Sequence, residues 1–173
     1  MMSKVLLYIA QTLDGYIADK HDELTFLDAY NDYPSIHESF KLLDQRVGVE
    51  IMGRRTYDWM LSHGGNFSKD HEIIVISSKN VSDQHVQFYS GDLKTLIENL
   101  KKNQTKDIWL VGGGVLIKSF IELDLIDEYQ IAILPVLIGS GVPLFHQANI
   151  YKNLSFVKSE CLGDIVLLTY LKT

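Results

Sequence analysis

Short runs of apolar residues alternate along the chain with segments in which apolar residues recur every three or four positions. The uninterrupted runs predict buried strands at residues 4–10, 47–52, 72–77, 86–90, 107–111 and 128–136. The periodic segments predict helices at residues 35–45, 56–62, 92–102 and 114–122. Two last apolar runs, 154–161 and 164–172, follow one another across Leu162-Gly163, which is typical of a hairpin. Strands that first alternate with helices and then become consecutive indicate an α/β fold with a mostly parallel sheet and an antiparallel edge.

Polar side chains mark the expected starts of the helices. Ser35 and Thr56 are expected to cap the first two helices. Asp92 lies near the start of the third helix and lysines lie at its end, and both suit the helix dipole. Residues 11–34 separate the first strand from the first helix and predict a long polar connection.

Length and composition favour one domain over residues 1–173, because 46% hydrophobic residues suffice for a core without disulfides or metals. The single cysteine, Cys161, cannot form an internal disulfide, so nothing argues for an oxidising compartment. The first apolar run ends at Gln11 without a signal-peptide cleavage pattern. No run approaches the roughly 20 residues that a transmembrane helix needs. A cytoplasmic protein without a membrane partner is therefore expected.

Charge and side-chain chemistry argue against three further functions: nucleic-acid binding, metal binding and hydrolysis. A net charge of −6 disfavours a broad nucleic-acid surface, although a small anion needs only a few local donors. The histidines at positions 21, 37, 63, 71, 85 and 146 are scattered without metal-ligand spacing, so no metal site is expected and most should lie on the surface. No Gly-x-Ser-x-Gly motif supports a hydrolase.

One arrangement, a strand followed by glycine and the start of a helix, occurs twice. In VEIMGRRTYDWM, Gly53 ends a strand and Thr56 can cap the helix that follows. The free amides at the start of this helix and the guanidinium groups of Arg54 and Arg55 suit a phosphate. In DIWLVGGGVLIKSF, the glycines 112–114 allow positive φ and remove every Cβ that would keep a ligand away. Each motif alone fits a tight corner without a ligand equally well. Together, at the carboxyl edge of a parallel sheet, they predict a site for the two phosphates of a dinucleotide.

Two more segments extend this hypothesis. The Ser77-Ser78-Lys79 cluster offers hydroxyls and an ammonium for a ribose 2′-phosphate, which would favour NADP over NAD, although an ordinary polar turn also fits. Asp14 follows the first strand and either belongs to a simple turn or offers a carboxylate to a substrate, with Ala10 and Ile17 flanking a nicotinamide ring. A Rossmann fingerprint is absent because Ile117 stands where its third glycine should be, and no P-loop sequence occurs.

Taken in order, these motifs resemble those of the dihydrofolate reductase-like superfamily. The chain is most similar to stand-alone relatives of the C-terminal reductase domain of the bifunctional riboflavin biosynthesis protein RibD. The resemblance covers nearly the whole chain and rests on TLDGYIA, MGRRTY, VISSK, IWLVGGGVLI and DEYQIAILPVLIGSGVPLF. It implies a three-layer fold, with helices on both faces of the sheet and a C-terminal antiparallel hairpin.

The resemblance also implies roles along this edge, with NADPH as the cofactor. Its phosphates would contact Gly53, Arg54, Arg55 and Thr56, and its 2′-phosphate would face Ser77, Ser78 and Lys79. Its pyrophosphate would be wrapped by Val111, Gly112, Gly113, Gly114, Val115 and Leu116, across a Gly112–Gly113 peptide that is often cis in this fold. Its nicotinamide would lie beside Ala10 and Ile17. The substrate is expected near Asp14, Tyr16, Leu137, Gly139 and Gly141.

Three departures from the family patterns bear on the substrate. Folate reductases carry a Trp, a Pro and an acid after the first strand, whereas DAYNDYPSIHESF has Pro34 and Phe40 but only Glu38 as the nearest acid. This weakens dihydrofolate as the substrate. The fused riboflavin enzymes also carry a zinc deaminase, for which one cysteine is too few, so only a reductase half is expected. Thr12 replaces the serine usual in the SLDG form of the first motif.

The leading prediction is an NADPH-dependent reductase acting on a small substrate of the pyrimidine-ribosyl type, similar to the 5-amino-6-(5-phosphoribosylamino)uracil reductase of riboflavin biosynthesis. Asp14 is the first candidate for the proton-relaying group and Glu38 the second. Three alternatives stay open: dihydrofolate reductase-like activity on a pterin or another carbonyl or imine, an NADP-binding module without turnover, and a small dimeric structural protein. The resemblance also implies a homodimer, for which the apolar C-terminal strands offer a surface.

Overall fold

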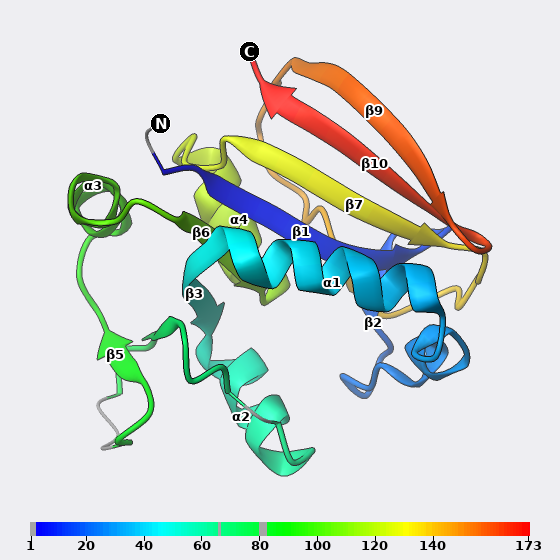
Figure 1. The fold of residues 1–173 in the computed structure, drawn as a ribbon, viewed down its shortest axis with the longest axis horizontal. Helices are drawn as coiled ribbons and strands as arrows, with labels where there is room; N and C mark the ends of the chain where they lie inside the picture. Colours follow the sequence, from blue (N-terminus) through cyan, green and yellow to red (C-terminus); the bar gives the residue numbers. More distant parts are fainter. Residues whose placement is uncertain (1–2, 66, 80–82) are drawn as a thin grey trace.

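The structure is a computed structural model that describes residues 3–65, 67–79 and 83–173. Its main sheet has eight strands in the order β5-β4-β3-β6-β1-β7-β10-β9 (Figure 1). The first six strands in this order are mutually parallel: β5 (Gln87–Tyr89), β4 (Glu72–Ile76), β3 (Val47–Gly53), β6 (Asp107–Gly112), β1 (Val5–Thr12) and β7 (Glu128–Leu134). At one edge, β10 (Ile165–Lys172) and β9 (Leu154–Leu162) form the antiparallel hairpin. A separate two-stranded sheet pairs β2 (Tyr16–Ala18) with β8 (Val142–Pro143).

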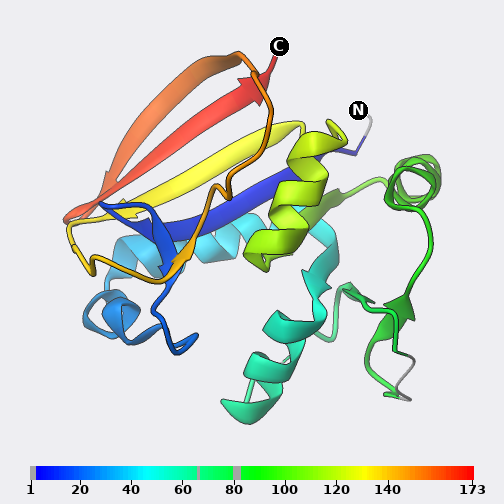
Figure 2. The same ribbon diagram turned by 180° about the vertical axis from the view of Figure 1, so that it is seen from behind.

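Helices cover both faces of the sheet, as the alternation of the strand side chains requires. On one face, Met52 of β3 packs in a cluster with Tyr57 of α2 (Arg54–Ser62), and α1 (Pro34–Arg46) lies over β1 on the same side. On the other face, Ile51 shares a core with α3 (Leu93–Asn103) and α4 (Gly114–Glu122). Figure 1 shows α1 in front of the sheet, and Figure 2 shows α4 in front when the molecule is seen from behind. The predicted three-layer α/β fold is confirmed. None of the helices within the described ranges has the length and apolar content to cross a membrane.

Several predicted element boundaries were wrong. Helix α1 starts at Pro34 with Tyr33 as its N-cap, so Ser35 is not the cap; proline suits the first helical position because its missing N–H costs nothing there. Helix α2 starts at Arg54 with Gly53 as the N-cap, so Thr56 is not a cap either. The prediction for Asp92 was right, since its carboxylate accepts a hydrogen bond from the Thr95 amide at 2.8 Å.

The connection 11–34 is more ordered than its polarity suggested. It contains β2 and a 3-10 helix, η1 (Thr25–Tyr30), which packs against the core under α1 through Phe26 and Leu27. Strand β7 ends at Leu134, before the predicted limit, because the next residue is Pro135, which has no amide to donate to a neighbouring strand.

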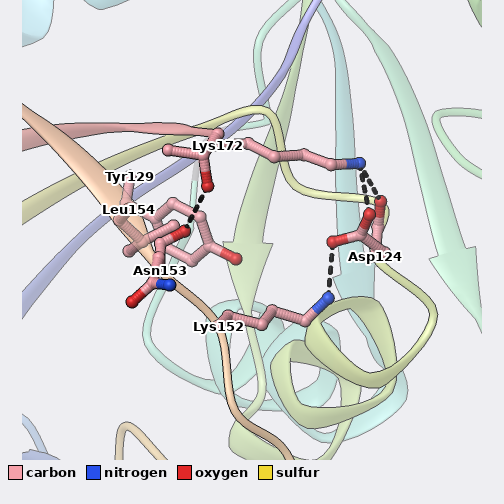
Figure 3. Close-up of a pocket in the computed structure, with 7 residues that line it drawn as sticks. Asp124, Tyr129, Lys152, Asn153, Leu154 and Lys172 are labelled. Atoms are coloured by element: carbon pink, nitrogen blue, oxygen red, sulfur yellow. Dashed lines mark hydrogen bonds and ion pairs between the residues drawn. The ribbon is translucent and has the colours of Figure 1, made fainter.

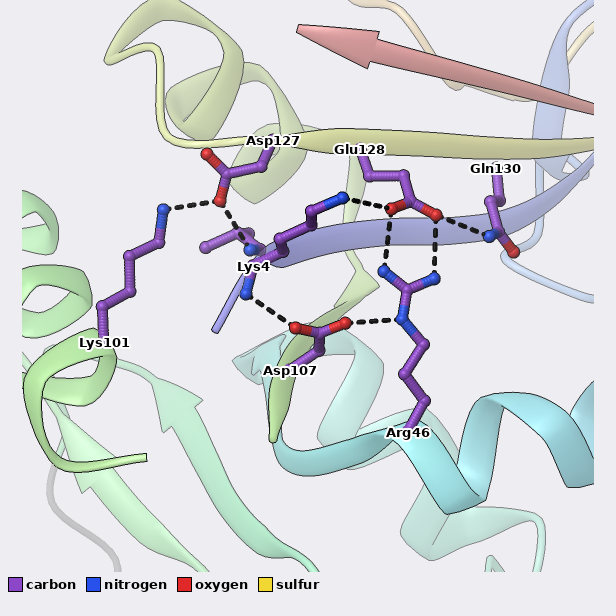
Figure 4. Close-up of polar contacts among 8 residues, drawn as sticks. Lys4, Arg46, Lys101, Asp107, Asp127, Glu128 and Gln130 are labelled. Carbon is purple, nitrogen blue, oxygen red and sulfur yellow. Dashed lines mark hydrogen bonds and ion pairs between the residues drawn. The ribbon is translucent and has the colours of Figure 1, made fainter. Parts of the chain in front are cut away.

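Ion pairs lie at the edge of the sheet where the parallel strands begin, which we call the amino edge. Both Lys152 and Lys172 contact the carboxylate of Asp124, in the turn after α4, and thereby fasten the end of β10 (Figure 3). They border a hollow of about 120 Å³. At the same edge of the sheet, Arg46 at the end of α1 donates two hydrogen bonds of 2.8 Å to Glu128 of β7 and a third to Asp107 of β6 (Figure 4). These contacts join three elements that are far apart in the sequence.

Candidate cofactor-binding site

The carboxyl ends of the parallel strands bring the sequence motifs together at one edge of the sheet. Strands β1, β3, β4, β6 and β7 all run in the same direction, so the loops that follow them open on the same side. The strand ends and the segments that follow them hold the predicted site residues: TLDGY from the end of β1, GRRT from the end of β3, SSK after β4, GGG from the end of β6 and LPVLIGSG from the end of β7. Parallel α/β sheets bind ligands in the crevice at this edge.

Two helix N-termini meet at the centre of this edge. Strands β3 and β6 are neighbours, so α2 and α4 start side by side. Gly113 has a φ of 95°, and a Cβ added to it would lie 3.3 Å from Thr56 Oγ1 and 3.8 Å from Gly53 Cα. Neither helix has a side-chain cap. The free amides of both first turns therefore carry the positive potential that binds anions.

The turn between β6 and α4 differs from the family expectation. Within the described residues there is no cis peptide bond, so the predicted cis Gly112–Gly113 peptide was wrong here. The chain makes the turn instead through positive φ angles of 148° at Gly112 and 95° at Gly113. Glycine reaches this region at little steric cost, because it lacks a Cβ.

The two arginines after Gly53 take different positions. Arg54 donates to Asp58 at 2.8 Å and lies over the rings of Tyr57 and Phe88, and its Nη1 is buried without a hydrogen-bond partner among the described residues. Arg55 is largely exposed and pairs with Asp22 from the loop after β2. Arg54 thus has a donor without a partner among the described residues at the start of α2, whereas Arg55 joins the first turn of α2 to the loop after β2.

The other residues assigned to the cofactor lie around this centre. The Ser77 hydroxyl bonds its own turn, donating to the Lys79 carbonyl and accepting from the Lys79 amide, both at 3.1 Å. Ser78 and Lys79 are exposed, and Lys79 has no carboxylate partner among the described residues. In α4, Val115 is 73% exposed while Leu116 is buried in the core. Val111 is half-buried against the α2 cluster. Val111 and Leu116 therefore turn their side chains into the cores and offer the edge only their backbone.

Asp14 is hydrogen-bonded to a neighbouring loop. Its carboxylate accepts hydrogen bonds from the Thr12 hydroxyl at 2.6 Å, the Gly139 amide at 2.7 Å and the Ile138 amide at 3.1 Å. The Thr12 bond, together with the amide bonds, lowers the pKa of the Asp14 carboxyl below its ordinary value. The group is therefore a carboxylate near neutral pH, with its oxygens already occupied. This geometry favours positioning of the loop 137–141 over proton donation.

The rest of the first motif supports the same loop. The buried Thr12 hydroxyl also accepts from the Tyr16 amide at 3.0 Å, so threonine keeps the function that a serine hydroxyl would have there. The Tyr16 hydroxyl donates to the Gly139 carbonyl at 3.4 Å. Leu137 is 69% exposed beside this loop, and Gly141 lies against the Ala18 carbonyl. Asp14, Tyr16 and the loop 137–141 with Leu137, Gly139 and Gly141 thus lie together; we refer to this place as the mouth of the predicted site.

Three other predicted positions are not gathered there. Ala10 packs against the core under α1, whereas Ile17 packs against the core under α4. The two side chains therefore do not face each other as the predicted pair on either side of a nicotinamide ring. Glu38 is exposed on α1 and has no ion pair among the described residues. The inward position on that turn belongs to Ser39, whose hydroxyl lies 2.7 Å from the Tyr8 hydroxyl.

Comparisons with known proteins identify the family. The family model described as "RibD C-terminal domain" matches residues 3–168. The chain belongs to the RibD C-terminal domain family. The Bacillus subtilis protein YwjB is similar to it over 99% of both chains, with 31% identity. A solved protein from Shewanella sp. PV-4, assigned provisionally to riboflavin biosynthesis, is 32% identical over 98% of this chain and 99% of its own, with a TM-score of 0.89.

Two more distant structures share the fold of this RibD C-terminal domain. One is a Thermotoga maritima diaminohydroxyphosphoribosylaminopyrimidine deaminase/5-amino-6-(5-phosphoribosylamino)uracil reductase, 18% identical with a TM-score of 0.71, of which the chain covers 57%. The other is dihydrofolate reductase from Enterococcus faecalis, complexed with NADP(H) and a further ligand, 15% identical with a TM-score of 0.69 over 99% of that chain. The dihydrofolate reductase-like fold inferred from the motifs is therefore confirmed.

Two polar residues at this edge of the RibD C-terminal domain were missed from the sequence. Gln11 Oε1, near the end of β1, and His146 Nε2, beside α4, are buried without a hydrogen-bond partner among the described residues. The prediction that most histidines are surface residues did not single out His146 as a site residue. Its place directly after GSGVPLF was the available signal, because that segment follows β7 into the site. Arg54 Nη1 is a third such atom, and a polar ligand would supply the partner that each lacks; Ser3, Trp59 and Thr169 carry further unpartnered atoms elsewhere in the fold.

Two hollows of this RibD C-terminal domain lie away from the carboxyl edge. One of about 400 Å³ lies between α1 and the sheet and is lined by Phe40, Lys41, Leu43, Asp44, His71 and Trp109. The other is the hollow beside Asp124 at the amino edge. Within the described ranges, no three His, Cys, Asp or Glu side chains gather as metal ligands. At the carboxyl edge, a ligand would meet the free backbone amides of two helix starts.

Proposed function

We propose that the protein is an NADPH-dependent reductase of a small substrate of the pyrimidine-ribosyl type. The observation that carries the proposal is the meeting of two uncapped helix N-termini at Gly53 and Gly113. The first residue of α2, Arg54, also has an Nη1 without a partner among the described residues. This combination provides backbone donors, a favourable dipole and a guanidinium donor for two linked phosphates. Membership of the RibD C-terminal domain family supports the riboflavin-pathway substrate class.

Different residues at this edge bind different parts of the cofactor. The first turns of α2 and α4 hold the pyrophosphate, with Arg54 adding its free donor. Ser78 and Lys79 face the 2′-phosphate, because they are exposed after β4, the strand next to β3. The TLDGY motif borders the nicotinamide end at the close of β1. When bound, NADPH supplies the hydride for a C=N or C=O carbon of the substrate.

The protein contributes position more than proton chemistry. Asp14 fixes the loop 137–141 through the amides of Ile138 and Gly139, and so shapes the mouth over the nicotinamide end. A reduced C=N or C=O also takes up a proton, and a water held at this mouth is the donor we propose. Such placement of reactants is a large part of what an enzyme with a cofactor provides.

The proposal is tested by following NADPH consumption at 340 nm against riboflavin-pathway pyrimidines, folates and simple carbonyls, together with an NADPH binding titration. Oxidation with the ribosyl pyrimidine, and little with the others, is expected. Oxidation with a pterin alone would show folate-type activity. Binding of NADPH without oxidation of any of these substrates would favour a module without turnover and contradict the proposed reductase.

Replacing Lys79 with alanine should reduce the preference for NADPH over NADH. The ammonium is exposed and unpaired among the described residues, so it is free to contact a phosphate that NADH lacks. Loss of one exposed charge–phosphate contact should weaken NADPH binding about five- to tenfold and leave NADH binding unchanged. Titration of both cofactors with wild type and Lys79→Ala measures this ratio. Lys69→Ala, in the loop before β4, is the control, and an unchanged ratio in Lys79→Ala would remove Lys79 from the site.

We also propose a homodimer that forms through the hairpin β9–β10. Strand β9 is the sheet edge, and its residues up to Cys161 are exposed, including Phe156 at 60% and Val157 at 47%. Long apolar edge strands in stable proteins are usually covered. Wild type should therefore elute as a dimer in size-exclusion chromatography with light scattering, and Phe156→Asp should elute as a monomer. Lys158→Asp on the same strand is the charge control. A monomeric wild type would refute the dimer.

A further inference from the structure

The segment 137–146 lies between the two ends of the cofactor site. On one side it is tied to the first motif: Asp14 accepts from the amides of residues 138 and 139, the Leu144 amide donates to the Gly15 carbonyl at 2.9 Å, and β8 pairs with β2. On the other side, Leu144 is fully buried in the core that contains Leu116 and Ile117 of α4. The segment therefore contacts both the substrate mouth and the phosphate turn.

His146 makes the second contact a close one. A Cβ added to Gly114, the first residue of α4, would lie only 2.3 Å from His146 Nε2 and 3.1 Å from the Pro143 carbonyl oxygen. Only glycine leaves room for the imidazole at that position. The imidazole edge thus rests against the first turn of α4, directly after the glycines of the phosphate turn.

The imidazole lacks a partner for its buried nitrogen. His146 Nε2 has no hydrogen bond among the described residues, although its neighbours at the start of α4 are amides without a cap. A buried polar atom without a partner is costly, so a ligand that supplies the missing hydrogen bond gains affinity. A phosphate oxygen at this turn would accept from an Nε2–H, and it is also the group that the adjacent amides attract.

We propose that His146 is a positioning residue that couples the cofactor phosphates to the loop 137–146. The inference rests on the proposed NADPH site and deepens it. A phosphate at α4 gives Nε2 the hydrogen bond that it lacks, and the imidazole then holds the end of the loop that Asp14 holds at its start. Binding of NADPH thereby orders the substrate mouth, and by linkage an ordered mouth binds NADPH more tightly.

The test combines NADPH titration with hydrogen exchange of the peptides covering 137–147, with and without saturating NADPH. In wild type, NADPH should slow exchange in this loop. His146→Phe keeps a flat ring without a donor; it should bind NADPH about tenfold more weakly and show no slowing when saturated. His146→Gln restores an N–H donor and should recover most of both effects. His37→Phe, which alters an exposed histidine on α1, is the control.

The outcomes separate the two proposals. If wild type binds NADPH but loop exchange and affinity are the same in His146→Phe, the coupling is overturned and the cofactor site stands. If wild type does not bind NADPH, both proposals are overturned. Circular dichroism shows whether His146→Phe is folded. If it is not, the comparison of wild type with His146→Gln tests the coupling. Equal slowing of hydrogen exchange by NADPH in the two proteins supports the coupling, and no slowing in wild type refutes it.

Discussion

Replacement of Gly113 with valine should abolish NADPH binding. Gly113 has a φ of 95°, a conformation that a β-branched residue adopts only under strain. Its Cβ would already lie 3.3 Å from Thr56 Oγ1, and the two further methyl groups of valine would fill the space between the N-termini of α2 and α4. Losing two charge-assisted hydrogen bonds to the phosphates would raise the NADPH dissociation constant about a hundredfold or more.

Gly64→Val is the matched control for this prediction. Gly64 also has a positive φ, 67°, but it lies after the end of α2 and a Cβ there would meet nothing within 4 Å. Both variants carry backbone strain, so both should lose some stability. Only Gly113→Val should lose NADPH. Calorimetric titration and thermal melts of the two proteins measure the effects separately. If Gly113→Val melts lower but keeps its affinity, the glycines form a structural corner and nothing more.

Replacement of Glu128 with glutamine should destabilise the fold strongly without touching the cofactor site. The carboxylate is 7% exposed, accepts two hydrogen bonds from Arg46 and also contacts Lys4 (Figure 4). Breaking this partly buried ion pair leaves the Arg46 charge poorly compensated, which costs about 1–3 kcal/mol of the free energy of unfolding, less than for a fully buried pair because Arg46 is 32% exposed and keeps Asp107. Urea unfolding measures this loss. Glu122→Gln breaks the exposed pair of Glu122 with Lys118 and should change stability by less than about 0.5 kcal/mol.

The same carboxylate predicts how stability depends on pH. The hydrogen bonds from Arg46 lower the pKa of Glu128 from its ordinary 4.5 to about 2. Because the folded-state pKa is the lower one, the stabilisation is complete above about pH 4.5 and is lost as the pH falls toward about 2. Wild type should therefore lose stability more steeply across this range than Glu128→Gln. Equal slopes in the two proteins would show that Glu128 contributes nothing to acid sensitivity.

The backbone of this site was predictable, because its motifs are punctuated by glycine and follow apolar runs. Gly53 and the glycines 112–114 each end a strand and start a helix, and parallel pairing of β3 with β6 brings them together. The order of the motifs also indicated the family. What patterning cannot give is which residue caps a helix: Tyr33, directly before Pro34, and Gly53 are the N-caps, not Ser35 and Thr56.

The side-chain roles were harder to predict, because they depend on contacts between distant residues. Asp14 has the same neighbours in sequence whether it donates a proton or holds a loop. Its role became clear only from the amides of Ile138 and Gly139, more than 120 positions away. His146 shows no motif of its own, and the role proposed for it rests on its contact with Gly114. Glu38 matched a family acid in approximate position, but the turn of α1 directs Ser39 inward instead.

The location of the cofactor is tested most directly by following the amide chemical shifts of isotopically labelled protein during an NADPH titration. The largest changes should fall on residues 53–56, 77–79 and 112–116, with smaller ones in 137–146. The hollow lined by Phe40 and Trp109, and the one beside Asp124, should show none. Absence of shifts throughout, or shifts confined to either hollow, would contradict an NADPH site at the carboxyl edge of the sheet.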